Sequence, residues 1–222
     1  MNRSLPAGAY RLHRRTGLFD QLLTEANRAL DVLGRSARAS RPNPAGKEVS
    51  DITPEEARHA AGLMRVNHVG EICAQALYRS QAMLCKDPQV TDVLLHAAQE
   101  EVDHLAWCDD RLRELDSRPS IFNPFWYAGS FALGLIASRA GVSYNLGFMA
   151  ETERQVEQHL DSHLESLPQA DARSRRVVEQ MRDDEIEHRR TAEHNGAASL
   201  PPPIKAAMRM MSKIMTTTAY RL

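Results

Sequence analysis

Apolar residues recur along most of this chain at spacings of three and four, the period of an amphipathic α-helix. Residues 18–33 carry leucines and a phenylalanine on one face and stop at Gly34, which predicts a helix that packs on a larger body or on a membrane. A polar, proline-containing stretch, residues 35–50, is predicted to be a linker. No stretch alternates apolar and polar residues as a half-buried strand does. The pattern therefore predicts an all-α protein.

Prolines, glycines and capping residues divide the following sequence into four long helical segments. They are expected at about residues 53–85, 88–116, 143–167 and 170–195. The first two are joined by Lys86 and Asp87 alone, and the last two by a similarly short connection around Pro168. Short connections imply antiparallel neighbours, so the four segments should form two helical hairpins that pack as a four-helix bundle.

A carboxylate and an imidazole stand three residues apart at 101–104 and again at 185–188, and each pair follows another glutamate by about 30 residues. On a helix this spacing puts both side chains on the same face, here within an apolar stripe. Because a buried carboxylate needs a cation or a hydrogen-bond donor, this arrangement points to metal. One Glu from each of two helices plus Glu-x-x-His from two others is the ligand set of ferritin-like di-iron bundles. The predicted ligands are Glu71, Glu101, His104, Glu153, Glu185 and His188.

Other acidic residues and histidines compete with this set. Glu56 and His59 repeat the spacing, but Thr53 to Glu56 reads as a capping box at a helix start, so that pair is set aside. On the third long helix Glu153 falls inside the apolar face, whereas Glu157 lies at its margin and Glu151 is expected to be a solvated charge. Two histidines near the ligands, His68 and His159, are interpreted as outer support or, for His68, a surface residue.

Composition narrows the choice of partners. The 222 residues include 28 basic and 29 acidic side chains, a balance that does not favour nucleic acid. Three cysteines without paired spacing indicate a reducing compartment. Residues 1–16 contain four arginines and no acid, a composition also found in mitochondrial presequences. The domain organisation is expected to be an N-terminal helix and polar linker over 1–50, then a metal-binding bundle over 51–222, as one domain.

Three motifs resemble a known family: Asn-His-Val-Gly-Glu at 67–71, Glu-Val-Asp-His-Leu at 101–105 and Asp-Glu-Ile-Glu-His at 184–188. The chain resembles the demethoxyubiquinone hydroxylases of ubiquinone biosynthesis from about residue 18 to its C-terminus. The resemblance implies a monooxygenase with two iron ions per subunit and the six ligands named above. It also implies dioxygen as co-substrate and ring hydroxylation of a polyprenylated demethoxyubiquinol. The electrons would come from NADH or from the quinol, although the sequence has no Gly-x-Gly-x-x-Gly fingerprint.

Two apolar segments bear on the membrane. Residues 119–138 hold no charge, and their number alone permits a membrane span. A single span there would leave Glu71 and Glu185 on opposite sides of the bilayer, so we expect a hydrophobic crossover over about 119–142, at an interface or buried. A cationic amphipathic helix follows the prolines at 201–203 and is expected to contact either a membrane or the bundle.

A lipid-soluble substrate implies a peripheral membrane protein. The expected location is the cytoplasmic face of a bacterial inner membrane, or alternatively the matrix face of the mitochondrial inner membrane. Other proteins of ubiquinone biosynthesis are considered as partners. Three rival functions remain open: a ferritin-like iron storage or detoxification protein, a peroxide reductase resembling rubrerythrins, and a non-catalytic bundle with structural metal.

Overall fold

The computed structural model describes residues 17–36, 38–47 and 50–222, and these contain helices and no strands. The basic stretch over residues 1–16 lies outside the described residues. The helices are α1 (Leu18–Leu33), α2 (Pro54–Leu84), α3 (Pro88–Glu114), α4 (Asn123–Arg139), α5 (Val142–Ser166), α6 (Ala172–His194) and α7 (Pro202–Arg221). The prediction of an all-α protein is confirmed, and the four long helices begin and end within two residues of the predicted bounds.

The helix starts follow from local side-chain chemistry. At the start of α2, the Thr53 hydroxyl accepts from the backbone N–H of Glu56, and the Glu56 carboxylate accepts from the backbone N–H of Thr53. This is the predicted capping box. Asp87 caps α3 by accepting from the backbone N–H groups of Gln89 and Val90, and Asp171 caps α6 by accepting from the backbone N–H of Ser174.

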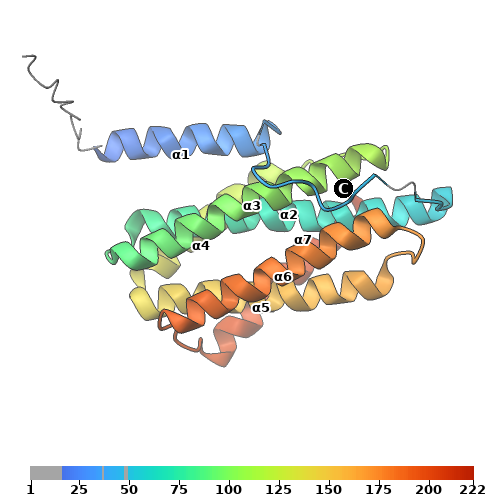
Figure 1. The fold of residues 1–222 in the computed structure, drawn as a ribbon. Coiled ribbons are helices and arrows are strands. Elements are labelled where there is room, and N and C mark those ends of the chain that lie inside the picture. The colour runs from blue at the N-terminus through green and yellow to red at the C-terminus, as the bar shows by residue number, and fades with distance from the viewer. Residues whose placement is uncertain (1–16, 37, 48–49) are drawn as a thin grey trace, which may run out of the picture.

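The helices α2 and α3 form one antiparallel hairpin, and α5 and α6 form the other, as Figure 1 shows. The two hairpins pack as a ferritin-like four-helix bundle, which confirms the predicted architecture. Helix α4 connects them and lies along α2, while α1 extends along the outside of the α2–α3 hairpin. Because α2 contacts α1, α3, α4, α5 and α7, it is buried on nearly every side.

Two apolar clusters fill the bundle and leave a polar layer between them. One cluster joins Met64, Trp107, Leu112, Leu160 and Met181, among others. The second joins Tyr78, Leu94, Leu146 and Met149, among others. On each of the four bundle helices the predicted ligand lies in sequence between the residues of these two clusters. Apolar packing above and below the ligands therefore fixes their common position along the axis of the bundle.

The crossover is a helix that packs along α2. A Cβ atom at Gly134 would lie 2.0 Å from Ser80 Oγ and 2.5 Å from the Leu77 carbonyl oxygen, so only glycine permits this close approach of α4 and α2. On its other side, Phe125 and Ile136 are both 67% exposed. The segment is therefore half buried, between the two alternatives that the sequence left open. Among the described residues, no helix has the length and apolarity needed to cross a membrane.

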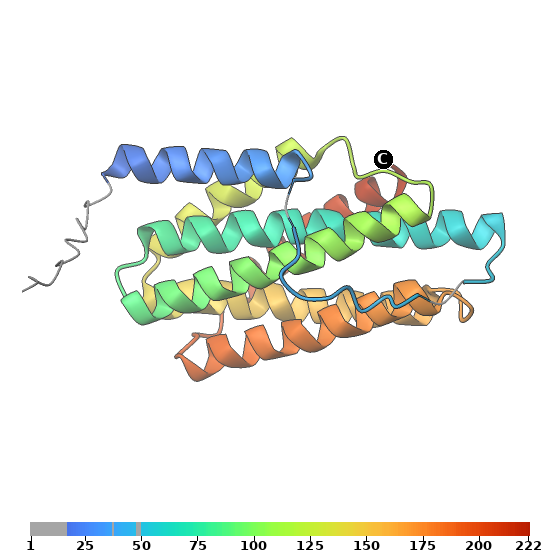
Figure 2. The same cartoon turned by 45° about the horizontal axis from the view of Figure 1, so that its top comes forward.

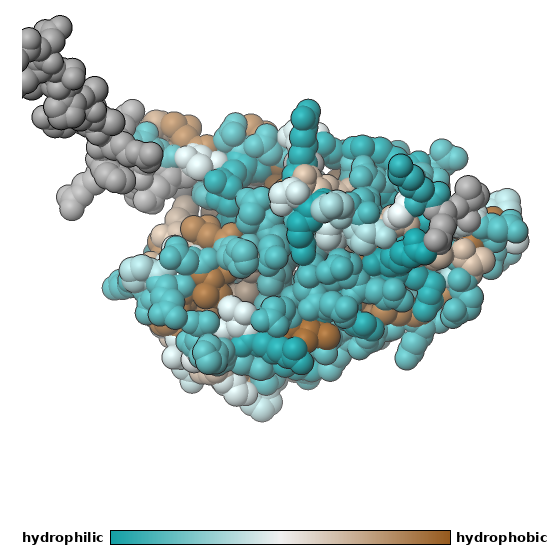
Figure 3. Space-filling model, in the orientation of Figure 1, coloured by the Kyte–Doolittle hydropathy of each residue, from teal (hydrophilic) through white to brown (hydrophobic). Residues whose placement is uncertain are grey.

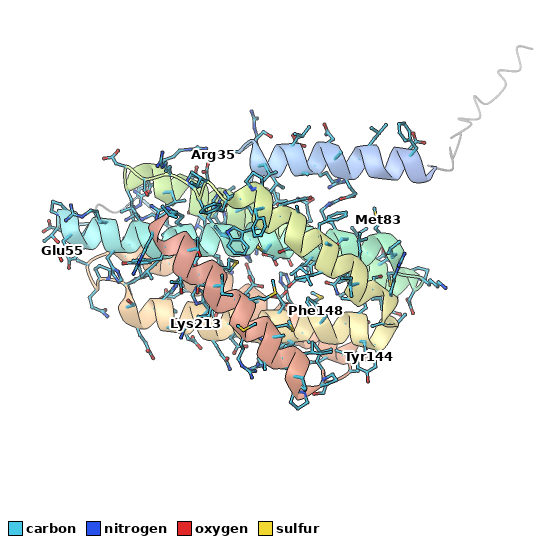
Figure 4. All side chains as sticks on the ribbon, turned by 180° about the vertical axis from the view of Figure 1, so that it is seen from behind. Arg35, Glu55, Met83, Tyr144, Phe148 and Lys213 are labelled. Carbon is cyan, nitrogen blue, oxygen red and sulfur yellow. The ribbon has the colours of Figure 1, made fainter. Side chains whose placement is uncertain are left out.

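Helix α7 crosses the outside of the bundle and contacts α2 and α5, as seen from behind in Figure 4. Ala219 is buried, and a Cβ atom on Gly62 of α2 would meet the Tyr220 ring at 2.5 Å. Met210 and Ile214, by contrast, are 63% and 55% exposed. Packing against the bundle thus occupies one face of α7, and a second apolar face remains exposed.

Candidate metal centre

The six predicted ligands meet in the polar layer of the bundle. All six side chains are buried, and His188, at 5% exposed, is the most accessible. They come from all four bundle helices: Glu71 from α2, Glu101 and His104 from α3, Glu153 from α5, and Glu185 and His188 from α6. Burial of so many carboxylates in one layer is costly unless cations or donors face them.

The six side chains form two overlapping groups, in each of which the potential ligand atoms lie within 4.8 Å of one another. The first group contains Glu71, Glu101, His104 and Glu185, and the second contains Glu101, Glu153, Glu185 and His188. Glu101 and Glu185 belong to both groups, which is the position of carboxylates that bridge two metal ions. Each group contains residues from both hairpins.

Both histidines turn the same nitrogen toward the carboxylates. His104 Nδ1 lies 2.9 Å from Glu101 Oε2, 3.4 Å from Glu185 Oε1 and 3.5 Å from Glu71 Oε2. His188 Nδ1 lies 3.1 Å from Glu185 Oε2, 3.5 Å from Glu101 Oε1 and 3.6 Å from Glu153 Oε1. The Nδ1 atoms are therefore the nitrogens placed to bind metal.

The opposite ring nitrogens are held by two carboxylates in a crossed arrangement. His104 on α3 places Nε2 2.9 Å from Asp184 Oδ2 on α6, and His188 on α6 places Nε2 2.8 Å from Glu100 Oε2 on α3. Each of these carboxylates immediately precedes a ligand glutamate. A carboxylate on the distal nitrogen orients the ring and fixes its tautomer. The sequence reasoning missed both residues, although the paired acids at 100–101 and 184–185 were a visible signal.

The electrostatics of the carboxylates reflect their crowding. Burial and the negative charge of Glu101 raise the pKa of Glu71, and burial and the charge of Glu185 raise the pKa of Glu153. Burial also acts to raise the pKa of Glu101, but hydrogen bonds with His104 and other neighbours outweigh it and lower that pKa. The crowding therefore favours a cation, either a proton or a metal ion, at Glu71 and Glu153.

The donor set fits a pair of divalent metal ions. Oε1 of Glu101 is buried and has no hydrogen-bond partner, so this oxygen is left for a cation. Carboxylate oxygens and imidazole nitrogens without thiolates suit iron and manganese. The histidines retain protons for an electrostatic reason: burial lowers the pKa of His104, but hydrogen bonds with Asp184 and the ligand glutamates raise it above its ordinary value. Metal would displace these protons.

Tyr78 of α2 adds a contact that the sequence reasoning did not identify. Its hydroxyl donates to Glu153 Oε1 at 2.5 Å, and the side chain is completely buried. Burial, followed by the charge of Glu153, raises the pKa of Tyr78 well above its ordinary value. The phenol therefore remains a hydrogen-bond donor that orients Glu153.

The competing glutamates of α5 lie outside both groups. Glu151 is 4% exposed, so the prediction of a solvated charge is wrong. Its carboxylate binds Arg154 at 2.5 Å and lies 3.5 Å from Lys205 of α7, which covers the side of α5 opposite the metal layer. Glu157 pairs instead with Arg189 at 3.1 Å.

The other histidines considered as candidates, His68, His159 and His59, also lie outside the two groups. His68 is 1% exposed, so it is not a surface residue, and its Nε2 lies 4.0 Å from Asp109 Oδ1. His159 packs against His163 with 3.9 Å between ring centroids. His59, of the pair that was set aside, lies 2.7 Å from the Tyr220 hydroxyl through Nδ1.

Two helical hairpins, repeated Glu-x-x-His pairs and a buried layer of four carboxylates and two imidazoles define a ferritin-like carboxylate bundle. Residues 58–219 match the family described as ubiquinone biosynthesis protein COQ7. The chain belongs to this family.

Curated relatives agree over nearly the full length. A protein of Bordetella avium (strain 197N) is 63% identical over 213 residues, covering 96% of this chain and 99% of the relative. Relatives from Xanthomonas euvesicatoria pv. vesicatoria (strain 85-10) and Polynucleobacter asymbioticus (strain DSM 18221 / CIP 109841 / QLW-P1DMWA-1) are 58% identical over 205 residues and 56% over 207. They cover 91% and 92% of this chain, and this chain covers 94% and 99% of them. All three bear the name 3-demethoxyubiquinol 3-hydroxylase, so the iron-storage alternative is not supported.

Proposed function

We propose that this protein is a di-iron monooxygenase that hydroxylates the ring of a polyprenylated demethoxyubiquinol in ubiquinone biosynthesis. The observation that carries the proposal is the pair of overlapping ligand groups, each with one histidine Nδ1 atom and three carboxylates. The names of relatives at 56–63% identity support the same substrate class and reaction. Bound iron would supply the reduction of dioxygen and the transfer of one oxygen atom to the ring.

Two of the six side chains would bind one metal ion, two would bind the other, and two would bind both. His104 and Glu71 would serve one ion, and His188 and Glu153 the other, while Glu101 and Glu185 would bridge the two. Tyr78 would keep the Glu153 carboxylate in place, and the carboxylates of Asp184 and Glu100 would keep the imidazole rings turned inward.

The test is a single-turnover reaction. The chain is loaded anaerobically with ferrous iron, mixed with labelled dioxygen and a short-tailed demethoxyubiquinol, and the mass of the product is measured. We expect one labelled oxygen atom in the product. A chain loaded with two ferrous ions would need no other electrons for its first turnover, so separate multiple-turnover reactions with and without NADH distinguish NADH from the quinol as the source of electrons.

Glu101→Ala and Glu185→Ala should each lose iron and activity together. Glu56→Ala is the matched control, because Glu56 has the same spacing to a histidine but caps α2. Oxidised iron that accumulates without hydroxylated product would instead support iron storage.

We also propose that α4 and α7 rest on the cytoplasmic face of a bacterial inner membrane. Large apolar side chains are exposed on both helices: Ile121, Phe122, Phe125 and Ile136 on and just before α4, and Ile204, Met210, Met211 and Ile214 on α7. Exposed Arg209 and Lys213 accompany them and suit anionic lipid. The face of the molecule shown in Figure 3, opposite to that of Figure 4, is mostly hydrophilic. A membrane-bound orientation would bring the protein to a substrate dissolved in the bilayer.

A flotation assay with anionic liposomes tests this orientation. Lys213→Glu should weaken binding, because a basic residue near such a surface contributes about 1 kcal/mol. Arg190→Glu on α6 is a matched control with the same change of charge on an exposed residue of another helix. Lys205 is a poor choice since it already pairs with Glu151. Equal weakening by both variants would mean that net charge, and not this face, determines binding.

A further inference from the structure

The segment between α1 and α2 runs across α3 toward α6, as Figure 2 shows. Although the sequence predicts only a polar linker there, Ser40 and Arg41 make contacts behind the metal centre. These two residues precede the part of the chain that matches the family, which begins at residue 58.

Asp103 of α3 anchors the segment. The Asp103 side chain is 2% exposed, and its Oδ1 accepts from the backbone N–H of Ser40 at 2.6 Å. The Ser40 hydroxyl lies 3.1 Å from the same oxygen, and Arg41 Nε donates to Oδ2 at 2.7 Å. A buried carboxylate that receives these donors fixes the position of the arginine that follows.

The free end of the Arg41 guanidinium reaches the crossed carboxylates. Arg41 Nη1 lies 2.9 Å from Asp184 Oδ2, the same oxygen that lies 2.9 Å from His104 Nε2. Arg41 Nη2 lies 3.4 Å from His104 Nε2, and the guanidinium carbon is 4.9 Å from the centroid of the Trp107 ring. Arginine suits this place because its planar fork contacts Asp103 and Asp184 together, which the single ammonium of lysine does not reproduce.

Arg41 contacts the two ligand groups unequally, with closer contacts around His104 than around His188. Glu100, which contacts His188, places Oε1 3.8 Å from Arg41 Nη1 and Oε2 3.6 Å from His96 Nε2. Arg41 therefore makes its close contacts on the His104 half alone.

We propose that Arg41 is a positioning residue for the metal centre, which holds Asp184 and through it the ring of His104. The inference rests on the metal centre proposed above. Loss of Arg41 would leave Asp184, whose side chain is 16% exposed, with Gln180 as its other side-chain donor, since Gln180 Nε2 donates to Asp184 Oδ1 at 3.0 Å. The oxygen that contacts His104 Nε2 would lose its cationic partner, and the hold on the ring would weaken. The ion held by His104 should then bind more weakly, while the ion held by His188 keeps its ligands and their support.

Anaerobic titration of the full chain with Co²⁺ tests the inference without any turnover. Visible absorption follows the coordination of each ion, and a competing chelator gives the two stepwise affinities. In Arg41→Gln we expect one of the two Co²⁺ ions to bind about 10–100-fold more weakly, with a changed absorption band, because this is the usual effect of losing an outer-shell partner. The second affinity should not change, and Arg41→Lys should fall between the two proteins.

Arg35→Gln is the matched control, since Arg35 lies in the same segment and pairs with Asp109 of α3 at 2.6 Å, away from His104. It should leave both affinities unchanged. If Arg41→Gln fails to fold, Arg41→Lys carries the same comparison. Unchanged affinities in both Arg41 variants, equal weakening of both ions, or equal effects of the Arg35 and Arg41 variants would overturn the role of Arg41 alone. A wild-type chain that binds fewer than two Co²⁺ ions would overturn the metal centre as well.

Discussion

Glu153 and Glu151 offer a direct test of the ligand assignment, because they lie two residues apart on α5 and both are buried. Replacement by glutamine keeps the volume and removes only the charge. In Glu153→Gln the amide oxygen can still accept from Tyr78, so the main loss is an anionic ligand. In Glu151→Gln the loss is the attraction to Arg154 and Lys205, outside the two ligand groups.

The size of the expected effect follows from linkage between binding and folding. At a free metal concentration 100 times the dissociation constant, one site stabilises the fold by about 2.7 kcal/mol. If the substitution weakens that site about 100-fold, the same concentration contributes only about 0.4 kcal/mol. For a chain of this size, 1 kcal/mol corresponds to about 2–4 °C in melting temperature. The metal-induced rise should therefore be smaller by about 5–9 °C in Glu153→Gln.

The assay is anaerobic thermal unfolding with and without ferrous iron or Co²⁺. Without metal, Glu153→Gln should melt no lower than wild type, because it removes one of four buried carboxylates that crowd two imidazoles. Glu151→Gln should melt lower without metal and keep the full metal-induced rise. The opposite pattern, with a full rise in Glu153→Gln and a lost rise in Glu151→Gln, would refute the assignment of the metal-facing side of α5.

Three further predictions concern stability away from the ligands. Burial, and to a lesser extent the charge of Arg35, lower the pKa of His68 to about 3 from 6.5, so the contribution of His68 to stability should fall by about 1.4 kcal/mol between pH 7.5 and 5.5 as the unfolded state gains its proton. In urea unfolding, the change in stability over this pH range should therefore differ by about that amount between His68→Gln and the wild-type chain. Thr53→Ala removes the cap of α2 and should lower the free energy of unfolding by about 1 kcal/mol in the same assay. The metal content should not change, and a loss of metal would contradict a purely capping role. Glu25→Gln leaves Arg79, which is 8% exposed, without its paired carboxylate, so the free energy of unfolding should fall by about 1.5–3 kcal/mol. Proteolysis between α1 and α2 should become faster, and an unchanged rate would mean that this pair does not hold α1 in place.

The helices and most of the site follow from local patterns. Apolar spacing and the caps at Thr53 and Asp87 determine the helices within a few residues, and Glu-x-x-His on an apolar stripe is enough to predict that the ligands converge. The helical periodicity of α5 gave a wrong prediction for Glu151, because it assumes that a helix has only one buried side. Helix α7 contacts α5 and supplies Lys205 to Glu151 from outside the bundle, and such a contact depends on where a distant segment docks.

Arg41 could not have been found in the same way. It lies outside any helix, so no periodicity marks its direction, and its partners Asp103 and Asp184 are far away in sequence. Asp103 also has no apolar neighbour pattern that distinguishes it from a solvated acid. Only the folded path of the segment across α3 brings these three charges together.

The sharing of Glu101 and Glu185 between the two groups has a consequence for biosynthesis of the protein. Neither metal position is complete until α6 has been made and has docked, because both groups include Glu185. The ribosome adds the 81 residues from His104 to Glu185 in about 4–16 s at about 5–20 residues per second. Throughout this interval the nascent α2–α3 hairpin holds Glu71, Glu101 and His104 without the carboxylate that completes their site. Metal insertion at either proposed position would therefore follow the synthesis of both hairpins, and a chain truncated after α3 would carry half of the proposed ligands and neither complete group.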